Sequence, residues 1–555
     1  MSDTFIWKTD RPWPNPRLKC GAIVGHTTSK SSRIWIRTGR LGVFNLLVFE
    51  LNDETKKLFG LFKKVPCLID EIPQSVKRYT FTISDYNTDT TYVVDTNQLK
   101  ANTEYGYALH GMDSQIPRIL LGQDRPYTFR TMPNKRKLPF SFGFYSCHMP
   151  YKDSFFGNTN VVNLEMWDYF HSVLSEHHKN DLRFVIGGGD QVYVDGVNSL
   201  NIWNFLHKVA RKEDGNLLPE LDSMKSWYRD IYRGYWGFAN VQAVHSSYPN
   251  YMTWDDHELK DGWGSYKISD GSDDELNEIF DWQSKGLTRN EALELIARMK
   301  TAGFKIYEEY QHAHNPDTPS GQFDYELELA ESAFYFLDSR SSRDINKRSR
   351  RVLGQGQYRR FNQWLERLDV NRTPFVFIIS AVPVMHLNIV LANADANVLA
   401  DLADLQDDLR DSWEHGLHDS ERKGLLKALF SASKKGFRIC ILSGDVHTSA
   451  AFKMLDEQNG SVIYQLTSSA ITYNKPRVLS WVLGKTVADS GRSDDGYQFK
   501  RLALYTDSNF SIINVDPKGK CVWFKLYGKQ TVADPNGIEA DLPVKSEIVN
   551  LELKF

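Results

Sequence analysis

The chain contains 555 residues, of which 41% are hydrophobic and 25% are charged, and its formal net charge at pH 7 is −3. This length exceeds what one hydrophobic core usually organises, so we expect two or three domains. The nearly balanced charge excludes the strongly basic surface by which proteins bind nucleic acids or anionic membranes through electrostatics alone.

Neither the cysteines nor the first residues indicate export. The cysteines are few, odd in number and widely spaced, which favours a reducing compartment over a disulfide framework. They are Cys20, Cys67, Cys147, Cys440 and Cys521. The opening MSDTFIWKTDRPWPNP has no basic segment, apolar core or twin arginine. We therefore expect a cytoplasmic protein, and polar residues within the apolar stretch 375–392 predict a buried strand and loop rather than a membrane span.

The pattern of the chain changes near residue 139. Residues 1–16 are rich in proline and tryptophan and predict an irregular arm. Residues 17–134 show period-two runs broken by turn residues, which predicts an all-β sandwich of immunoglobulin or fibronectin type. After the linker-like NKRK, strands and helical stretches alternate, so we predict an α/β domain over 139–530. The remainder, 531–555, predicts a β-rich extension.

Within the α/β domain, residues 287–312 predict a long helix that begins with a threonine cap at position 288. Further helices are expected over 355–368, 399–409 and 421–432. After residue 460 the chain returns to strands.

Five apolar runs of this domain end in side chains suited to metal binding or phosphate chemistry. The run 140–146 ends at Cys147, 183–186 leads to Asp190 and Tyr193, 251–254 leads to Asp256 and His257, 333–337 leads to Asp338 and Arg340, and 439–442 leads to Asp445 and His447. Short apolar runs of this kind are typical of strands covered on both faces, whose carboxyl ends meet in one crevice. Carboxylate, imidazole, thiol and phenol groups that converge there could share a metal centre.

Each candidate also has a plain structural interpretation. Tyr193 could bind a ferric ion as phenolate, or it could be a core aromatic residue. A single cysteine in an apolar run is usually a small buried hydrophobe, which fits Cys440 inside its strand, whereas Cys147 lies at a strand end. The acidic run 255–258 could be a solvated turn, but after an apolar strand we expect it to be partly buried and to need partners.

Other catalytic motifs are incomplete in this sequence. The Gly-x-Gly at 187–189 lacks the third glycine of a dinucleotide-binding loop, because Val192 occupies that place. The Gly-Lys-Thr at 484–486 lacks the first glycine of a P-loop, because Leu479 stands there. No Gly-x-Ser-x-Gly elbow, His-Glu-x-x-His or paired Cys-x-x-Cys occurs.

Six motifs, in this order along the chain, resemble those of the alkaline phosphatase D (PhoD) family of metallophosphatases. They are FYSCHMPY, GGGDQVYVDG, TWDDHE, YFLDSR, VLGQGQYRRFNQWL and ILSGDVH. The resemblance covers most of residues 20–530. It implies an α/β fold with a four-layer α/β/β/α metallophosphoesterase core behind an N-terminal β domain. It also implies hydrolysis of phosphomonoesters or phosphodiesters by a metal-activated hydroxide.

The resemblance further implies ferric iron (Fe3+) with calcium (Ca2+), or another divalent pair, and a small-molecule phosphate ester as substrate. The implied iron ligands are Cys147, Asp190, Tyr193 and His447. The implied calcium ligands are Asp190, Asp256 and Asp445. His257 resembles the catalytic histidine of the family, and Arg340 a contact to the substrate phosphate.

This chain departs from the family pattern in two places. The family has a Trp-Asp element near its last helix, and Trp413-Glu414 stands here instead. This makes Glu414 a candidate metal ligand, with Asp411 as the alternative. The twin-arginine signal usual in the family is also missing, which favours a role other than periplasmic phosphate scavenging.

Two other functions fit the same residues. The fold could serve as a catalytically silent binding or scaffold protein, or the site could cleave a phospholipid head group or a nucleotide-like diester. The sequence predicts no oligomeric state.

Overall fold

The computed structural model describes most of the chain. The described residues are 17–62, 72–112, 118–121, 127–154, 159–197, 200–265, 276–277, 280–345, 352–386, 411–473, 487–493, 495–533, 539–543 and 547–555. The arm over 1–16, Cys67 and the helix expected over 399–409 lie outside them.

The N-terminal region consists of two antiparallel sheets that share one hydrophobic cluster. One sheet has the order β1 (Gly21–Thr27), β2 (Ser32–Arg37) and β5 (Thr91–Thr96). The other contains β4 (Lys77–Ile83), β3 (Gly42–Glu50), β6 (Glu104–Gly111) and β7 (Arg118–Leu121), with β8 (Tyr127–Arg130) also paired to β6. The β pattern of the sequence is interrupted by one helix, α1 (Asp53–Phe62), whose first turn carries two acidic residues that suit a helix N-terminus.

The first large sheet of the α/β region is mixed. Its order is β15 (Asn250–Thr253), β12 (Leu182–Gly188), β9 (Phe140–Tyr145), β24 (Asn509–Asp516), β25 (Cys521–Ala533) and β26 (Glu539–Pro543), and β27 (Val549–Leu553) pairs with β25. The strands β15, β12 and β9 are parallel, and β24 runs antiparallel to β9. Because β25 runs through residue 531 and β27 pairs with it, the C-terminal tail completes this sheet.

The second large sheet carries the other two strands that lead to candidate site residues, β17 (Ser332–Phe336) and β19 (Arg438–Ser443). Its order is β16 (Tyr325–Leu329), β17, β18 (Phe375–Ile379), β19, β21 (Ser461–Thr467), β20 (Ser449–Asp456), β23 (Gln498–Tyr505) and β22 (Ser490–Arg492). From β17 to β21 the strands are parallel. Strand β19 is buried along nearly its whole length, as its apolar run predicts.

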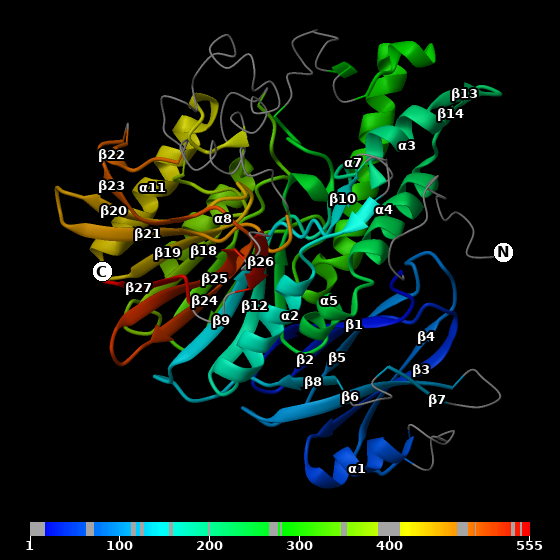
Figure 1. Ribbon diagram of the computed structural model, residues 1–555, viewed down its shortest axis with the longest axis horizontal. Helices are drawn as coiled ribbons and strands as arrows, with labels where there is room; N and C mark the ends of the chain where they lie inside the picture. Colours follow the sequence, from blue (N-terminus) through cyan, green and yellow to red (C-terminus); the bar gives the residue numbers. More distant parts are fainter. Residues whose placement is uncertain are drawn as a thin grey trace.

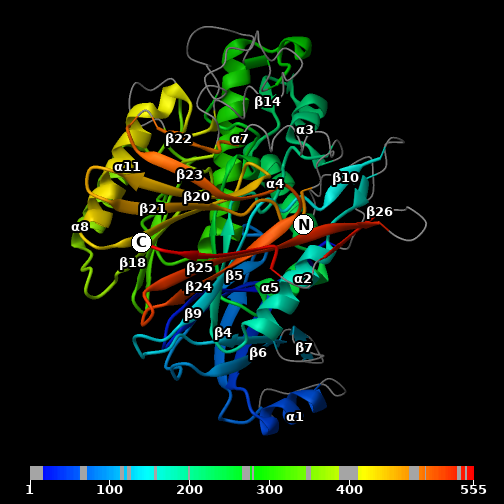
Figure 2. The same cartoon turned by 60° about the vertical axis from the view of Figure 1, so that its left-hand side comes forward.

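Aromatic side chains fill the space between the two large sheets. The ring of Phe142 on β9 lies 5.5 Å from that of Phe334 on β17 and 5.3 Å from that of Phe377 on β18, measured between centroids. Such edge-to-face pairs add to the gain from burial. The inner faces of both sheets therefore form one core, in a mixed α/β fold (Figures 1 and 2).

Helices cover the outer face of each large sheet. The helices α2 (Glu165–Ser172), α4 (Leu221–Tyr235), α5 (Ala239–His245) and α7 (Arg289–Tyr310) pack with the first sheet. The helices α8 (Gly354–Arg367) and α11 (Asp419–Lys434) pack with the second. The short elements are α3 (Ile202–Val209), β10 (Tyr151–Asp153), β11 (Thr159–Val161), β13 (Arg211–Glu213) and β14 (Asn216–Leu218).

The expected threonine cap opens α7. The Thr288 side chain accepts a hydrogen bond from the Glu291 backbone N–H, and the Glu291 carboxylate accepts one from the Thr288 backbone N–H at 2.8 Å. The bounds of α8 and α11 lie within two residues of those predicted. Across the described parts of the chain, no helix combines the length and apolar character needed to cross a bilayer.

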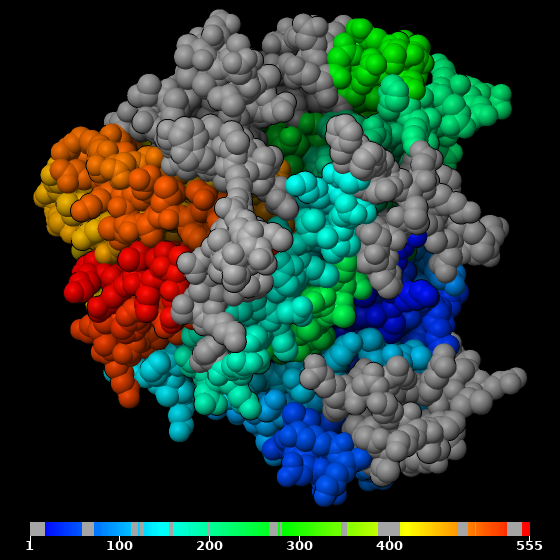
Figure 3. Space-filling view, viewed as in Figure 1, coloured from blue at the N-terminus to red at the C-terminus, as the bar shows by residue number. Residues whose placement is uncertain are grey.

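A buried group of charges joins the N-terminal region to α4 and α7. The Asp89 carboxylate accepts hydrogen bonds from Arg37 at 3.0 and 2.9 Å and from Arg233 at 2.6 Å. The Tyr310 hydroxyl donates to it as well. Asp89 comes from the N-terminal region, whereas Arg233 and Tyr310 come from the helices, so these bonds fix how the two regions dock. In the space-filling view, the blue N-terminal region lies directly against the cyan and green part of the chain (Figure 3).

Candidate metal centre

The candidate centre lies where strands of both large sheets end. Cys147 follows β9, Asp190 follows β12, Asp255 follows β15 and Asp445 follows β19. The loops approach closely at Gly444, where an added Cβ would lie 2.4 Å from the Cβ of Ser146 and 3.0 Å from the carbonyl oxygen of Gly188. A side chain at this position would force the two sheets apart, so glycine allows their loops to meet.

Three groups of candidate ligands share Asp190. Within each group, the potential ligand atoms lie within 4.8 Å of one another. The groups are Cys147, Asp190 and His447; Asp190, Asp256 and His257; and Asp190, Asp255, Asp256 and Asp445. A carboxylate common to all three stands in a position to bridge two cations.

Tyr193 completes the first of these groups. Its hydroxyl donates a hydrogen bond to Asp190 Oδ2 at 3.2 Å and lies 2.9 Å from His447 Nε2. The Cys147 thiol lies 3.5 Å from the same Asp190 oxygen. Ser469 supports this group, because its hydroxyl accepts the backbone N–H of His447 at 2.9 Å and lies 3.1 Å from Cys147 Sγ. The sequence analysis missed Ser469, since no local pattern marks it.

Four candidate ligands have a left-handed backbone, which is uncommon for residues other than glycine. Their φ angles are 55° at Cys147, 56° at Asp190, 63° at Asp445 and 51° at His447. Such a conformation costs on the order of 1–2 kcal/mol per residue and persists where the surrounding structure holds it. Here it turns each side chain out of its strand and into the common crevice.

Glu258 holds two of the ligand loops together. Its carboxylate accepts the backbone N–H groups of Asp190 at 3.1 Å, Gln191 at 2.5 Å and Asp255 at 2.8 Å, and the side-chain amide of Gln311 at 2.9 Å. Burial raises the pKa of Glu258 to about 7, although these hydrogen bonds oppose the shift. The sequence marked Glu258 only as part of an acidic run, whereas the structure shows it as the anchor of the loops after β12 and β15.

His257 is paired with a carboxylate that the sequence analysis left without a role. Its Nδ1 lies 2.7 Å from Oδ1 of Asp195, and its ring stacks on Tyr193 with the centroids 4.1 Å apart. Burial by itself would lower the pKa of His257, but Asp195 and Asp256 raise it, and the net pKa lies well above the ordinary value. Asp195 ends the motif GGGDQVYVD, so the signal for it was a second acid five residues beyond Asp190.

Arg340 is fully buried and its guanidinium is occupied by carboxylates of the protein. Its Nη1 and Nη2 donate to the two oxygens of Asp411 at 2.7 and 2.6 Å, and its Nε donates to Asp255. This differs from the expected contact to a substrate phosphate, because the forked donor that would grip a phosphate already grips Asp411. The sequence could not reveal this, since Asp411 and Arg340 lie in separate segments.

A sequence model of the PhoD-like phosphatase family matches residues 159–490, more than half of the chain. The chain belongs to the PhoD-like phosphatase family. The uncharacterized protein YGR266W of Saccharomyces cerevisiae (strain ATCC 204508 / S288c) is 22% identical over 360 residues, which are 53% of this chain and 48% of that protein. The chain thus spans about half the length of this curated relative.

Two solved structures share the fold. The structure of PhoD is 15% identical with a TM-score of 0.60, and the match covers 98% of this chain and 93% of that one. The purple acid phosphatase PPD1 from yellow lupin (Lupinus luteus) seeds is 11% identical with a TM-score of 0.50, and the match covers 95% and 74%. Both likenesses are to the mixed α/β fold.

In this PhoD-like chain, the departure at Trp413-Glu414 has a structural counterpart. Glu414 accepts hydrogen bonds from the Ser412 hydroxyl at 2.5 Å and from the His386 backbone N–H. Asp411 is bound by Arg340 and Arg343. Among the residues described, neither acid belongs to the groups whose ligand atoms converge. Burial would raise the pKa of Asp411, but the two arginines lower it, so this carboxylate is neutralised without a cation.

Within the PhoD-like centre, Arg340 pairs with Asp255 and Asp256, whereas Asp190 and Asp445 have no arginine partner among the described residues. Burial raises the pKa of Asp190 and of Asp445 well above the ordinary value, and the neighbouring Asp255 and Asp256 raise both further. Oδ1 of Asp190 and Oδ2 of Asp255 are buried and have no hydrogen-bond partner within the described structure. Buried acceptors with excess negative charge are the environment that a bound cation satisfies. The residues therefore fit the metals that the family implies.

Proposed function

We propose that this protein is a metal-dependent phosphoesterase that hydrolyses small phosphate esters at the centre around Asp190. The observation that carries this proposal is that ligand-type side chains from both large sheets converge on one shared carboxylate. Membership of the PhoD-like phosphatase family supports it. The four-layer α/β/β/α arrangement belongs to the proposal too, supported by the three hydrophobic clusters that alternate with the sheets.

The donor atoms divide into two sets. Thiol, phenol and imidazole groups form one set with Asp190, and they suit a transition metal such as Fe3+. Carboxylates of Asp256 and Asp445 form a second set with Asp190, and they suit Ca2+ or another divalent ion. When bound, such cations neutralise phosphoryl oxygens and lower the pKa of a water molecule toward about 7.

His257 supplies a proton in this proposal. Asp195 holds the Nδ1 side of its ring, and the charge of this carboxylate favours the protonated imidazole. The side chain is 17% exposed, whereas that of Asp195 is 4% exposed, so the ring reaches the open side of the centre. His257 is thus placed to protonate the oxygen that leaves when the P–O bond breaks, or to steady the phosphoryl charge.

Arg340 takes a positioning role instead of the expected substrate contact. It binds Asp255 and Asp411 from a fully buried position. By fixing Asp255, it orients the turn that carries Asp256 and His257. Glu414, held by Ser412, stays outside the proposed ligand set.

The test is to purify the protein in metal-replete buffer and assay p-nitrophenyl phosphate and bis(p-nitrophenyl) phosphate. Asp190→Ala removes the shared carboxylate, and we expect turnover to fall about 1,000-fold or more, because metal catalysis supplies several kcal/mol. Full activity of this variant would exclude the metal mechanism. A protein that binds metals and hydrolyses neither ester would support the catalytically silent binding role.

The identity of the metal has its own test. A phenolate bound to ferric iron gives a visible charge-transfer absorption band, which we expect for the iron-loaded protein. Tyr193→Phe removes only the hydroxyl and should abolish the band. A colourless active enzyme would support a plain divalent pair instead.

A further inference from the structure

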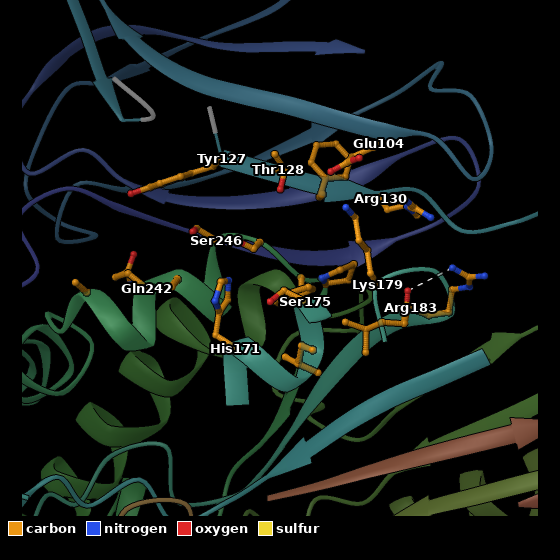
Figure 4. Close-up of a pocket in the computed structure, with 18 residues that line it drawn as sticks. Glu104, Tyr127, Thr128, Arg130, His171, Ser175, Lys179, Arg183, Gln242 and Ser246 are labelled. Carbon is orange, nitrogen blue, oxygen red and sulfur yellow. Dashed lines mark hydrogen bonds between the residues drawn. The ribbon is translucent and has the colours of Figure 1, made fainter. Parts of the chain in front are cut away.

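A cavity of about 450 Å³ lies far along the first sheet from the candidate centre, at the junction of the N-terminal region and the helices (Figure 4). One wall is formed by β6 and β8, and the other by α5 and the helical turn Val173–His177 that continues α2. Tyr107 bridges the two walls beside it, because its hydroxyl donates to the backbone carbonyl of Ser246 at 2.8 Å. A volume of this size is sufficient for a small organic ligand.

Three cationic side chains meet at one end of this cavity. Figure 4 shows Arg130, Lys179 and Arg183 close together there. Throughout the described part of the chain, neither Arg130 nor Lys179 has a side-chain ion pair, and the cavity lining contains one carboxylate, that of Glu104. This end therefore carries an excess of positive charge between two packed regions.

Arg183 is the least satisfied of the three. It is 8% exposed, and its Nη1 contacts only backbone carbonyls, of Asn180 and Leu182, each at 3.3 Å. Its Nε is buried and finds no acceptor among the described residues. Burial lowers the pKa of Arg183 and the nearby charge of Arg130 lowers it further, although the charge of Asp181 opposes part of this shift. A buried guanidinium in this state gains from an anion that accepts its free N–H.

The opposite end of the cavity offers a different chemistry. Gln242 lies there in Figure 4, and both its Oε1 and Nε2 are buried without partners in the described structure. The lining also includes the apolar side chains of Leu174 and Pro249. The cavity thus combines a cationic end, apolar surface and an amide that can donate and accept.

We propose that this interdomain cavity is a second binding site, for a small organic molecule that carries a phosphate or phosphonate group. The cavity lining holds three cations and one carboxylate, a net charge of about +2. This charge matches a doubly negative phosphate or phosphonate ligand better than a ligand with a single carboxylate group. Guanidinium groups bind its oxygens through paired hydrogen bonds. Arg130 lies on β8 and Arg183 is the second residue of β12, so the bound group joins the N-terminal region to the strand that leads to Asp190.

The experiment uses isothermal titration of the full, metal-loaded chain with phenylphosphonate, whose P–C bond resists ester hydrolysis. Two binding events are expected in the natural protein. Asp190→Ala removes the event at the metal centre and leaves the one at the cavity. Arg130→Gln weakens the cavity event about 10-fold or more, because a charge-assisted hydrogen bond is lost. Lys179→Gln, at an exposed side chain, weakens it in the same direction.

The matched control is Arg211→Gln, which removes the same charge from an exposed position on the β13–β14 hairpin and should leave both events intact. Benzoate, with one charge, should bind the cavity more weakly than phenylphosphonate, and inorganic phosphate reports the contribution of the anion alone. The proposal is overturned if the Asp190→Ala protein binds no phenylphosphonate, or binds it equally well after Arg130→Gln or Lys179→Gln is added. Binding only at the cavity would uphold this site and count against the proposed metal centre.

Discussion

Two buried groups of carboxylates in this protein differ in what neutralises them. At the junction of the N-terminal region with α4 and α7, Asp89 is bound by Arg37, Arg233 and Tyr310. At the strand ends, Asp190 and Asp445 lie beside further carboxylates, and neither has an arginine partner within the described part of the chain. Burial raises the pKa of Asp89, but the hydrogen bonds from Arg37 and the charge of Arg233 lower it overall, whereas the pKa of Asp190 is raised.

The Asp89 group and the Asp190 group therefore use buried charge differently. Removing carboxylates from water is expensive unless partners are supplied. The Asp89 group contains its own partners and so needs no ligand. The Asp190 group leaves its negative charge unbalanced, which is the state that a cation would relieve.

The largest expected effect that tests this difference is a fall in kcat when His257 is replaced. His257→Gln should lower kcat by about 100- to 10,000-fold, the range typical of a lost general acid, while metal binding persists. Asp195→Asn should cause a smaller loss and lower the apparent pKa of the basic limb, at which His257 loses its proton, because the ring loses its charged partner. The measurement is the pH profile of kcat and kcat/KM. His207→Gln, at an exposed histidine, is the control, and an unchanged profile in His257→Gln would contradict the assignment.

Replacing Asp89 should affect folding rather than chemistry. Asp89→Asn leaves Arg37 and Arg233 buried with less compensation, and we expect a loss of about 3 kcal/mol in the free energy of unfolding. Denaturant titration measures this loss, and the kcat of the folded fraction should match that of the natural protein. A large fall in kcat without a loss of stability would break the distinction between the two groups.

The smallest effect concerns pH and the metal-free protein. Burial is the largest cause that raises the pKa of Asp255 and of Glu258 to about 7. In the unfolded chain these groups ionise near pH 4. Between about pH 4 and pH 7 the folded state therefore binds more protons than the unfolded state, so stability contributed by these groups falls as pH rises.

We expect the Tm of the chelator-treated protein to drop across this window, measured by calorimetry at constant ionic strength. Added metal should reverse the drop, since a cation that binds only the folded state stabilises it by about 2.7 kcal/mol at 100 times its Kd. A metal-free protein that became more stable from pH 4 to pH 7 would contradict the inference that the buried carboxylates of the centre lack compensating positive charge.

The sequence by itself determined which residues stand at strand ends. Apolar runs followed by ligand-type side chains are a local pattern, and strands of one sheet end at a common edge. For this reason Cys147, Asp190, Asp256, Asp445 and His447 could be predicted to converge, and in the structure each of them belongs to a group of ligand atoms that includes Asp190. Their roles as metal ligands stay predictions.

Only the tertiary structure decided which partner each charged group meets. The sequence predicts that Arg340 contacts the substrate phosphate, but in the fold its guanidinium donates to both oxygens of Asp411. The anchor role of Glu258 and the cavity beside Arg183 depend in the same way on segments far apart in the chain. Strand ends are specified by neighbouring residues, whereas ion pairs and cavities arise from how whole elements pack, and no local pattern records that packing.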